Sequence, residues 1–119
     1  MHMLETSCET LTQQILAASI NDLKQAVSAL IGLDGIVELP NAERSAIING
    51  GIHTLNEIIL DEPIDLCLYD VIHLLSLASC CKHIAMMQSK QGEPRAEIMA
   101  IIQNVIVNLV QLLTNFDSK

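Results

Sequence analysis

The chain has 119 residues, half of them hydrophobic, and a net charge of −8. Its six basic residues are spread along the sequence, and it has one Tyr, one Phe and no Trp. Nucleic-acid binding needs clustered Lys and Arg, and single strands also need aromatic rings, so the composition argues against it. The shortage of basic residues also argues against binding to an anionic membrane surface. The length and apolar content predict one soluble domain over residues 1–119 with a sizeable core.

The cysteines indicate a reducing compartment, because Cys8, Cys67, Cys80 and Cys81 match no disulfide framework. The N-terminus has no basic region followed by an apolar run, so we expect no signal peptide. The most apolar stretch, 98–113, is interrupted by four amide side chains, whereas a membrane-spanning helix needs about 20 predominantly apolar residues. We therefore predict a cytoplasmic protein with no membrane span.

Turn-forming residues divide the chain into four segments with helical periodicity. In the first, from about 9 to 31, apolar residues recur every three or four positions and form one stripe. Its members are Leu16, Ile20, Leu23, Val27 and Leu30. The stripe is short for a coiled coil and fits a bundle helix better. Whether the helix passes Gly32 and continues to Leu39 is left open by the sequence.

The second segment, from about 41 to 60, begins with Asn41 as a plausible N-cap after Pro40. Gly50 and Gly51 interrupt its helical pattern, and each costs roughly 1 kcal/mol relative to Ala inside a helix. The pair therefore indicates either a kink or a place where another backbone comes very close. The kink is the preferred interpretation.

The third segment, from about 63 to 87, has Asp61 or Glu62 as its cap and Pro63 in the first helical position. Its apolar residues cover two adjoining arcs, so we expect a central helix that is buried on more than one side. One arc holds Ile64, Leu68, Val71, Leu75 and Ala78, and the other holds Leu66, Leu74, Leu77, Ile84 and Ala85.

The fourth segment, from about 94 to 116, begins at Pro94 and has apolar residues over about half of the helix circumference, at 100° per residue. This arc contains Ile98, Met99, Ile102, Val105, Ile106, Leu109, Val110, Leu112, Leu113 and Phe116, while Val107 lies outside it. Four helices with short connections predict an all-α, four-helix antiparallel bundle. Because the apolar arcs are too wide for one neighbour, we expect a homodimer that buries the wide aliphatic faces.

Two surfaces are candidates for binding a partner protein. The first is an acidic cluster around the turn between the second and third segments, made of Glu57, Asp61, Glu62, Asp65 and Asp70. It would dock a basic partner, although carboxylates at a helix N-terminus also have a purely structural role. The second is the uncharged polar face of the fourth segment, made of Gln103, Asn104, Asn108 and Gln111. Amides can hydrogen-bond in an interface without the desolvation of a charge.

Cysteine and histidine residues of the third segment supply the alternatives. Cys80 and His83 are three residues apart and share one helix face, so they form a weak candidate for a metal site. Cys80 and Cys81 are next to basic residues and are candidates for a redox sensor. No metal-binding or catalytic signature accompanies them, and free cysteines usually fill gaps in a core.

The interpretation that fits best is a non-enzymatic protein–protein interaction module, such as a small dimeric regulator, inhibitor or chaperone-like protein. It would need no cofactor, and its partners would be a second copy of itself and another protein. The alternatives are a metal or redox sensor based on Cys80, Cys81 and His83, and a carrier of a small apolar ligand in the bundle core. No motif assigns the chain to a family, and in size and acidity it resembles small bacterial or phage accessory proteins in type only.

Overall fold

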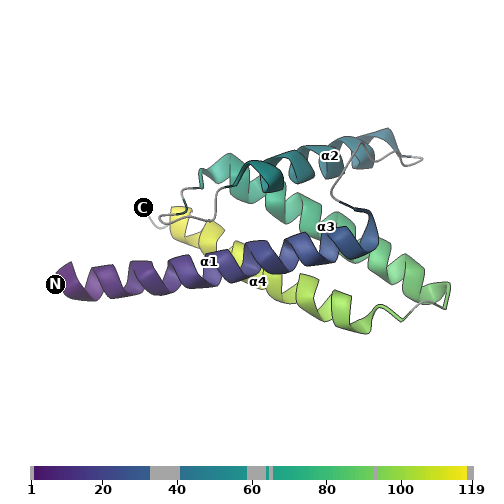
Figure 1. Ribbon diagram of the computed structural model, residues 1–119. Helices are drawn as coiled ribbons and strands as arrows, with labels where there is room; N and C mark the ends of the chain where they lie inside the picture. The colour runs from purple at the N-terminus through teal and green to yellow at the C-terminus, as the bar shows by residue number, and fades with distance from the viewer. Residues whose placement is uncertain (1, 33–40, 59–63, 65, 93, 118–119) are drawn as a thin grey trace.

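In the computed structural model the chain forms four α-helices (Figure 1). They are α1 (His2–Leu30), α2 (Ala42–Glu57), α3 (Leu68–Lys90) and α4 (Ala96–Asp117). The structure describes residues 2–32, 41–58, 64, 66–92 and 94–117, without the side chains of 2–12 and 115–117. Successive helices run in opposite directions, and no strand occurs in these ranges. The predicted all-α, four-helix antiparallel bundle is confirmed.

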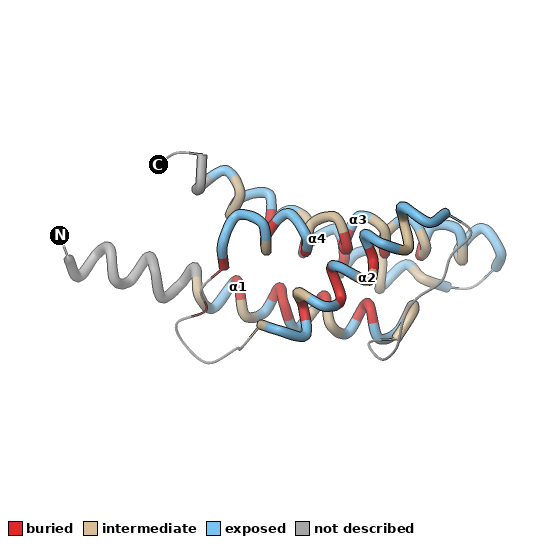
Figure 2. The backbone as a smooth tube through the Cα atoms, turned by 90° about the horizontal axis from the view of Figure 1, so that it is seen from above, coloured by how far each residue is buried: buried red, intermediate tan, exposed pale blue. Residues whose placement is uncertain are grey.

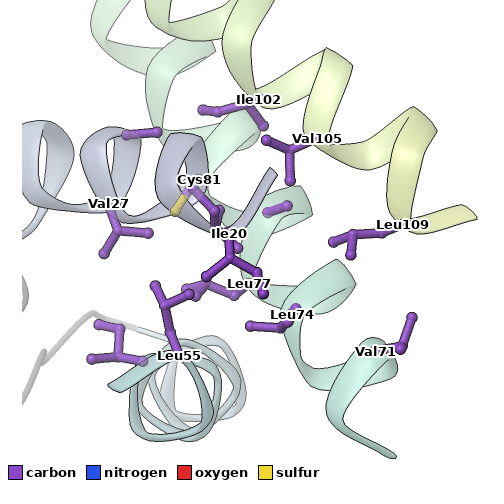
Figure 3. Packing of buried hydrophobic residues seen from close by; sticks show 14 of the residues in the cluster. Ile20, Val27, Leu55, Val71, Leu74, Leu77, Cys81, Ile102, Val105 and Leu109 are labelled. Atoms are coloured by element: carbon purple, nitrogen blue, oxygen red, sulfur yellow. The ribbon is translucent and has the colours of Figure 1, made fainter. Parts of the chain in front are cut away.

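The central position of α3 is also confirmed. It packs along α2 and α4 and also contacts α1, whose main neighbour is α4. In the described ranges, α1 and α2 follow each other in sequence but do not pack along each other. Figure 2 shows the buried residues of the helices turned toward the space between them. The largest buried side chains come from all four helices (Figure 3) and include Ile20, Leu23, Val27, Ile48, Leu55, Val71, Leu74, Leu77, Cys81, Ile102, Val105 and Leu109.

Helix α1 begins earlier than the periodicity predicts, at His2, and its C-terminus answers the question left open by the sequence. The carbonyl of Val27 accepts hydrogen bonds from the N–H groups of Ile31 and Gly32, each at 2.9 Å. Gly32 has a φ of +82°, a left-handed conformation that glycine adopts easily and that commonly ends a helix. The helix therefore ends at Leu30, and residues 33–40 lie outside the described part of the chain.

Helix α2 has the predicted N-cap. The side-chain Oδ1 of Asn41 accepts a hydrogen bond from the N–H of Arg44 at 3.0 Å, which satisfies one of the donors left unpaired at a helix start. The helix ends at Glu57, and Ile58 is already extended, so the helix is shorter than expected at its C-terminus. It continues without interruption through Gly50 and Gly51.

The surroundings of Gly51 favour the interpretation of the glycine pair as a place where another backbone comes very close. They do not favour the preferred interpretation as a kink. A Cβ atom at Gly51 would lie 2.5 Å from the Cβ of Leu77 and 3.2 Å from the backbone oxygen of His73. A Cβ atom at Gly50 would meet nothing within 4 Å. Only one of the two glycines is therefore needed for the packing of α2 against α3.

The predicted start of α3 at Pro63 is wrong, because the helix begins at Leu68 with Cys67 as its N-cap. The backbone N–H of Cys67 donates to Oδ2 of Asp70 at 3.2 Å, so Asp70 is the acid at this helix start. Ile64 and Leu66 are buried but precede the helix. Ile64 therefore does not belong to the predicted helical arc and Leu68 is 40% exposed, whereas Val71 and Ala78 of the same arc are buried as expected.

A glutamine of α1 fixes the chain before α3. The side-chain Oε1 of Gln13 accepts from the N–H of Ile64 at 2.6 Å, and its Nε2 donates to the oxygen of Ile64 at 2.9 Å. The amide thus satisfies both backbone groups of a residue that lies in no helix. Helix α4 begins at Ala96, two residues after the predicted start at Pro94.

Candidate interaction surface

The acidic cluster is only partly within the described residues, since Asp61, Glu62 and Asp65 lie outside them. Glu57 is an exposed residue at the end of α2, and its Oε1 lies 3.8 Å from Nε2 of His53. Asp70 is half-buried and caps α3 through Cys67. Of the two described members, Glu57 is therefore available to a partner, while Asp70 has the structural role expected of an acid at a helix start.

The four amides of the predicted polar face are divided between two sides of α4. The Nδ2 of Asn108 donates to Oγ of Ser19 on α1 at 2.9 Å, and Ser19 is itself buried. On the α3 side, Nζ of Lys82 donates to Oε1 of Gln103 at 2.6 Å. Asn104 and Gln111 are exposed. Asn108 therefore helps to hold α1 against α4, and the other three amides are on the surface.

The surface of α4 contains more apolar residues than the sequence indicates. Val107 and Val110 are each 43% exposed, although Val110 was expected in the buried arc. No ionisable residue occurs between Glu97 and Asp117. The exposed residues of this uncharged α4 face are Ala100, Gln103, Asn104, Val107, Val110, Gln111 and Thr114. The sequence indicated that Val107 is exposed, because its position lies outside the apolar arc of the fourth segment. Nothing in the sequence indicated that Val110 is exposed.

Burial favours the protonated thiols of Cys80 and Cys81. Burial raises the pKa of the Cys81 thiol to about 12, and the neighbouring Cys80 adds to the increase. Burial also raises the pKa of the half-buried Cys80 thiol, although the nearby positive charge of Arg44 lowers it in part. Metal binding and nucleophilic attack both need the thiolate, and both shifts favour the protonated thiol.

Among the residues whose side chains are described, the structure brings no further metal ligand to Cys80 and His83. His83 is exposed, and His73 has its Nδ1 3.2 Å from Oγ1 of Thr54. Among the described residues, no group of three or more His, Cys, Asp and Glu residues lies close enough together to hold a metal ion.

Grooves in the described part of the molecule lie at the surface between helices. One groove of about 440 Å³ lies between the start of α2 and the end of α3 and includes Arg44, His83, Ile84 and Met87. A smaller one, of about 80 Å³, lies between α1 and α4 beside the Asn108–Ser19 hydrogen bond. The buried hydrophobic residues of the four helices, with Ile64 and Leu66, form one cluster that includes Leu77 and Cys81.

Two described helical stretches are long and apolar enough to cross a bilayer by length and composition alone. They are Leu68–Lys90 and Ala96–Thr114, with mean hydropathies of 1.2 and 1.7. A mostly buried core helix of a soluble protein meets the same criteria. Here 33% and 17% of the two windows are buried, and the two stretches pack against each other.

Comparison with known proteins identifies no relative: no family model, no curated protein and no solved structure matches this chain. The fold and the surface described above are therefore the basis for a functional proposal.

Proposed function

We propose that this protein is a non-enzymatic interaction module and that the uncharged α4 face docks another polypeptide. The observation that carries the proposal is the absence of charge from this face in a chain with a net charge of −8. The centres of protein interfaces are depleted of charged residues, and their polar groups are hydrogen-bonded. Val107 and Val110 supply apolar contact, while Asn104 and Gln111 supply donors and acceptors.

The acidic turn provides a second surface for the same function. Glu57 is exposed there, and the cluster as a whole would attract a basic segment of a partner. Acidic rim residues mainly speed up association, whereas the uncharged α4 face would hold the partner once it is bound.

The proposal is tested by affinity capture with the wild-type chain and two matched variants. Val107→Asp places a carboxylate on the uncharged α4 face, and Ile47→Asp makes the same kind of change at a residue of α2 that is 44% exposed. We expect the Val107 variant to lose partners that the wild-type chain and the Ile47 variant both retain. Equal loss in both variants, or retention in both, would contradict docking through α4. Reversal of Asp61 and Asp65 to Lys in the same assay tests the acidic turn.

Native mass spectrometry separates this function from the alternatives. The reduced protein, purified without added metal, should show the mass of the chain or of its multiples. A stoichiometric metal ion would support the sensor instead, and an apolar adduct would support the carrier. Sedimentation together with phosphatidylcholine vesicles would indicate that the apolar helices insert into a bilayer, which would overturn the proposal.

A further inference from the structure

The small pocket between α1 and α4 is built from both polar and apolar side chains. It has a volume of about 80 Å³ and lies beside the hydrogen bond from Nδ2 of Asn108 to Oγ of Ser19. Its floor includes Ser19 and Leu109, which are 2% and 1% exposed. Its rim includes Ile15 of α1 and Gln111 of α4, which are both exposed. The pocket therefore leads from the surface to a buried hydroxyl group.

The polar groups at the pocket are only partly used inside the bundle. The hydroxyl oxygen of Ser19 accepts from Asn108, but its own O–H has no acceptor among the described residues. Within the same part of the chain, Oδ1 of Asn108 receives no hydrogen bond. Buried polar groups usually complete their hydrogen bonds with protein or with a bound group. The pocket thus offers one donor and one acceptor, next to each other, to whatever enters it.

The walls and the size of the pocket limit what can enter. Among the described side chains, no ionisable group lines it, and Leu109 and Leu112 are apolar, so a charged group would lose its hydration without gaining a counter-charge. One water molecule needs at least 10–15 Å³, so the pocket holds about five groups of that size. A carboxamide on two methylene groups, which is the side chain of glutamine, has the same number of heavy atoms. It is neutral, and its tip both donates and accepts.

We propose that this pocket binds a carboxamide side chain of the docked polypeptide. The inference rests on the proposed function and states which group of the partner is recognised. Gln111 connects the two surfaces, because it lies on the uncharged α4 face and also at the rim of the pocket. The partner's carboxamide donates to Oδ1 of Asn108 and accepts from the hydroxyl of Ser19. Its methylene groups contact Ile15 and Leu112. One anchor side chain in a pocket commonly supplies a large part of the binding energy of an interface.

Nuclear magnetic resonance of the ¹⁵N-labelled full chain tests the pocket without any partner. The probe is propionamide, which is the glutamine side chain without its backbone. We expect the side-chain NH2 signals of Asn108 and Gln111 to shift and to saturate at millimolar propionamide, since a ligand this small binds weakly. Propionate has the same shape but carries a charge, and it should cause no saturable shift of these signals.

Two variants with matched controls assign the binding to the pocket. Asn108→Leu should abolish the propionamide shift of Gln111, whereas Asn104→Leu, at an exposed position of α4 outside the pocket, should retain it. Ser19→Ala should weaken binding by about fivefold, because one hydrogen bond is lost. Ser28→Ala makes the same change at an exposed position of α1 and should have no effect. Ser19→Ala also keeps the test valid if Asn108→Leu loosens α1, which circular dichroism and thermal unfolding would reveal.

The outcomes separate this inference from the proposed function. Equal binding of propionate and propionamide, binding that survives both Asn108→Leu and Ser19→Ala, or the absence of any saturable shift would overturn the inference. In the capture experiment, a partner that Val107→Asp loses and Ser19→Ala retains at full strength would also overturn it while leaving docking through α4 intact. Equal capture by Val107→Asp and Ile47→Asp would contradict docking through α4, whatever the result with propionamide.

Discussion

Gly50 and Gly51 are adjacent in sequence, but their different surroundings in the fold give them different roles in the packing of α2. Gly50 and Gly51 both weaken the isolated helix, because glycine loses more backbone freedom than alanine on folding. Only Gly51 faces α3, where its missing Cβ makes room for the side chain of Leu77 and the backbone of His73. The sequence identified both glycines as unusual but contained nothing to tell them apart.

Alanine substitutions should therefore have opposite effects at the two positions. Gly51→Ala should lower the free energy of unfolding by about 1–3 kcal/mol, the usual cost of overpacking. Gly50→Ala should raise it by about 0.5–1 kcal/mol, because the helix gains stability and the new methyl group meets open space. Urea unfolding followed by circular dichroism measures both at one protein concentration. Stabilisation by both substitutions would show that α2 and α3 are not in close contact at Gly51.

Cys81 should make stability depend on pH in alkaline solution. Its thiol has a pKa raised from 9.0 to about 12 by burial. Above pH 9 the unfolded chain loses this proton while the folded chain keeps it, so the unfolded state is favoured as pH rises. The slope for one group is about 1.4 kcal/mol per pH unit until the folded thiol ionises. Unfolding curves between pH 8 and 11 should show a steeper loss in the wild type than in Cys81→Ala, and equal slopes would contradict the shift.

The helices themselves were predictable because their apolar residues recur at helical spacing. The stripes of the first and fourth segments place Ile20, Val27, Ile102 and Leu109 in the core, as expected. Boundaries were less predictable. Pro63 and its acidic neighbours form a strong start signal, yet the helix begins at Leu68, and the N–H of its N-cap residue Cys67 donates to Asp70. A nonlocal interaction outweighs the local signal there, because Gln13 of α1 hydrogen-bonds both backbone groups of Ile64, which precedes the helix.

Gln13 should therefore contribute to stability in a way that its neighbour does not. Gln13→Glu removes the Nε2 donor and places a carboxylate beside the oxygen of Ile64, which should cost about 1–3 kcal/mol. Gln14→Glu is the matched control, because Gln14 is exposed and the chemical change is the same. Thermal unfolding of the two variants at neutral pH compares them directly. Equal stability would show that the amide does not hold the chain before α3.

At the scale of the whole molecule, the position of the helices decides which apolar residues remain exposed. Helix α4 lies between α1 and α3, so its arc is buried on those two sides and Val110 falls outside both contacts. The amide row is divided for the same reason: Asn108 points to α1 and Gln103 to α3. The predicted polar face is therefore replaced by an uncharged surface of α4 that combines valines and amides.

The sequence by itself determined the all-α class, the number of helices, the core stripes and the N-cap at Asn41, because these depend on spacing and local hydrogen bonding along one chain. Only the tertiary structure decided which side of each wide apolar arc is covered, which glycine lies in a helix contact and which amides are used internally. Those outcomes depend on where the neighbouring helices lie, and a helix whose apolar arc is wider than one neighbour is compatible with several arrangements.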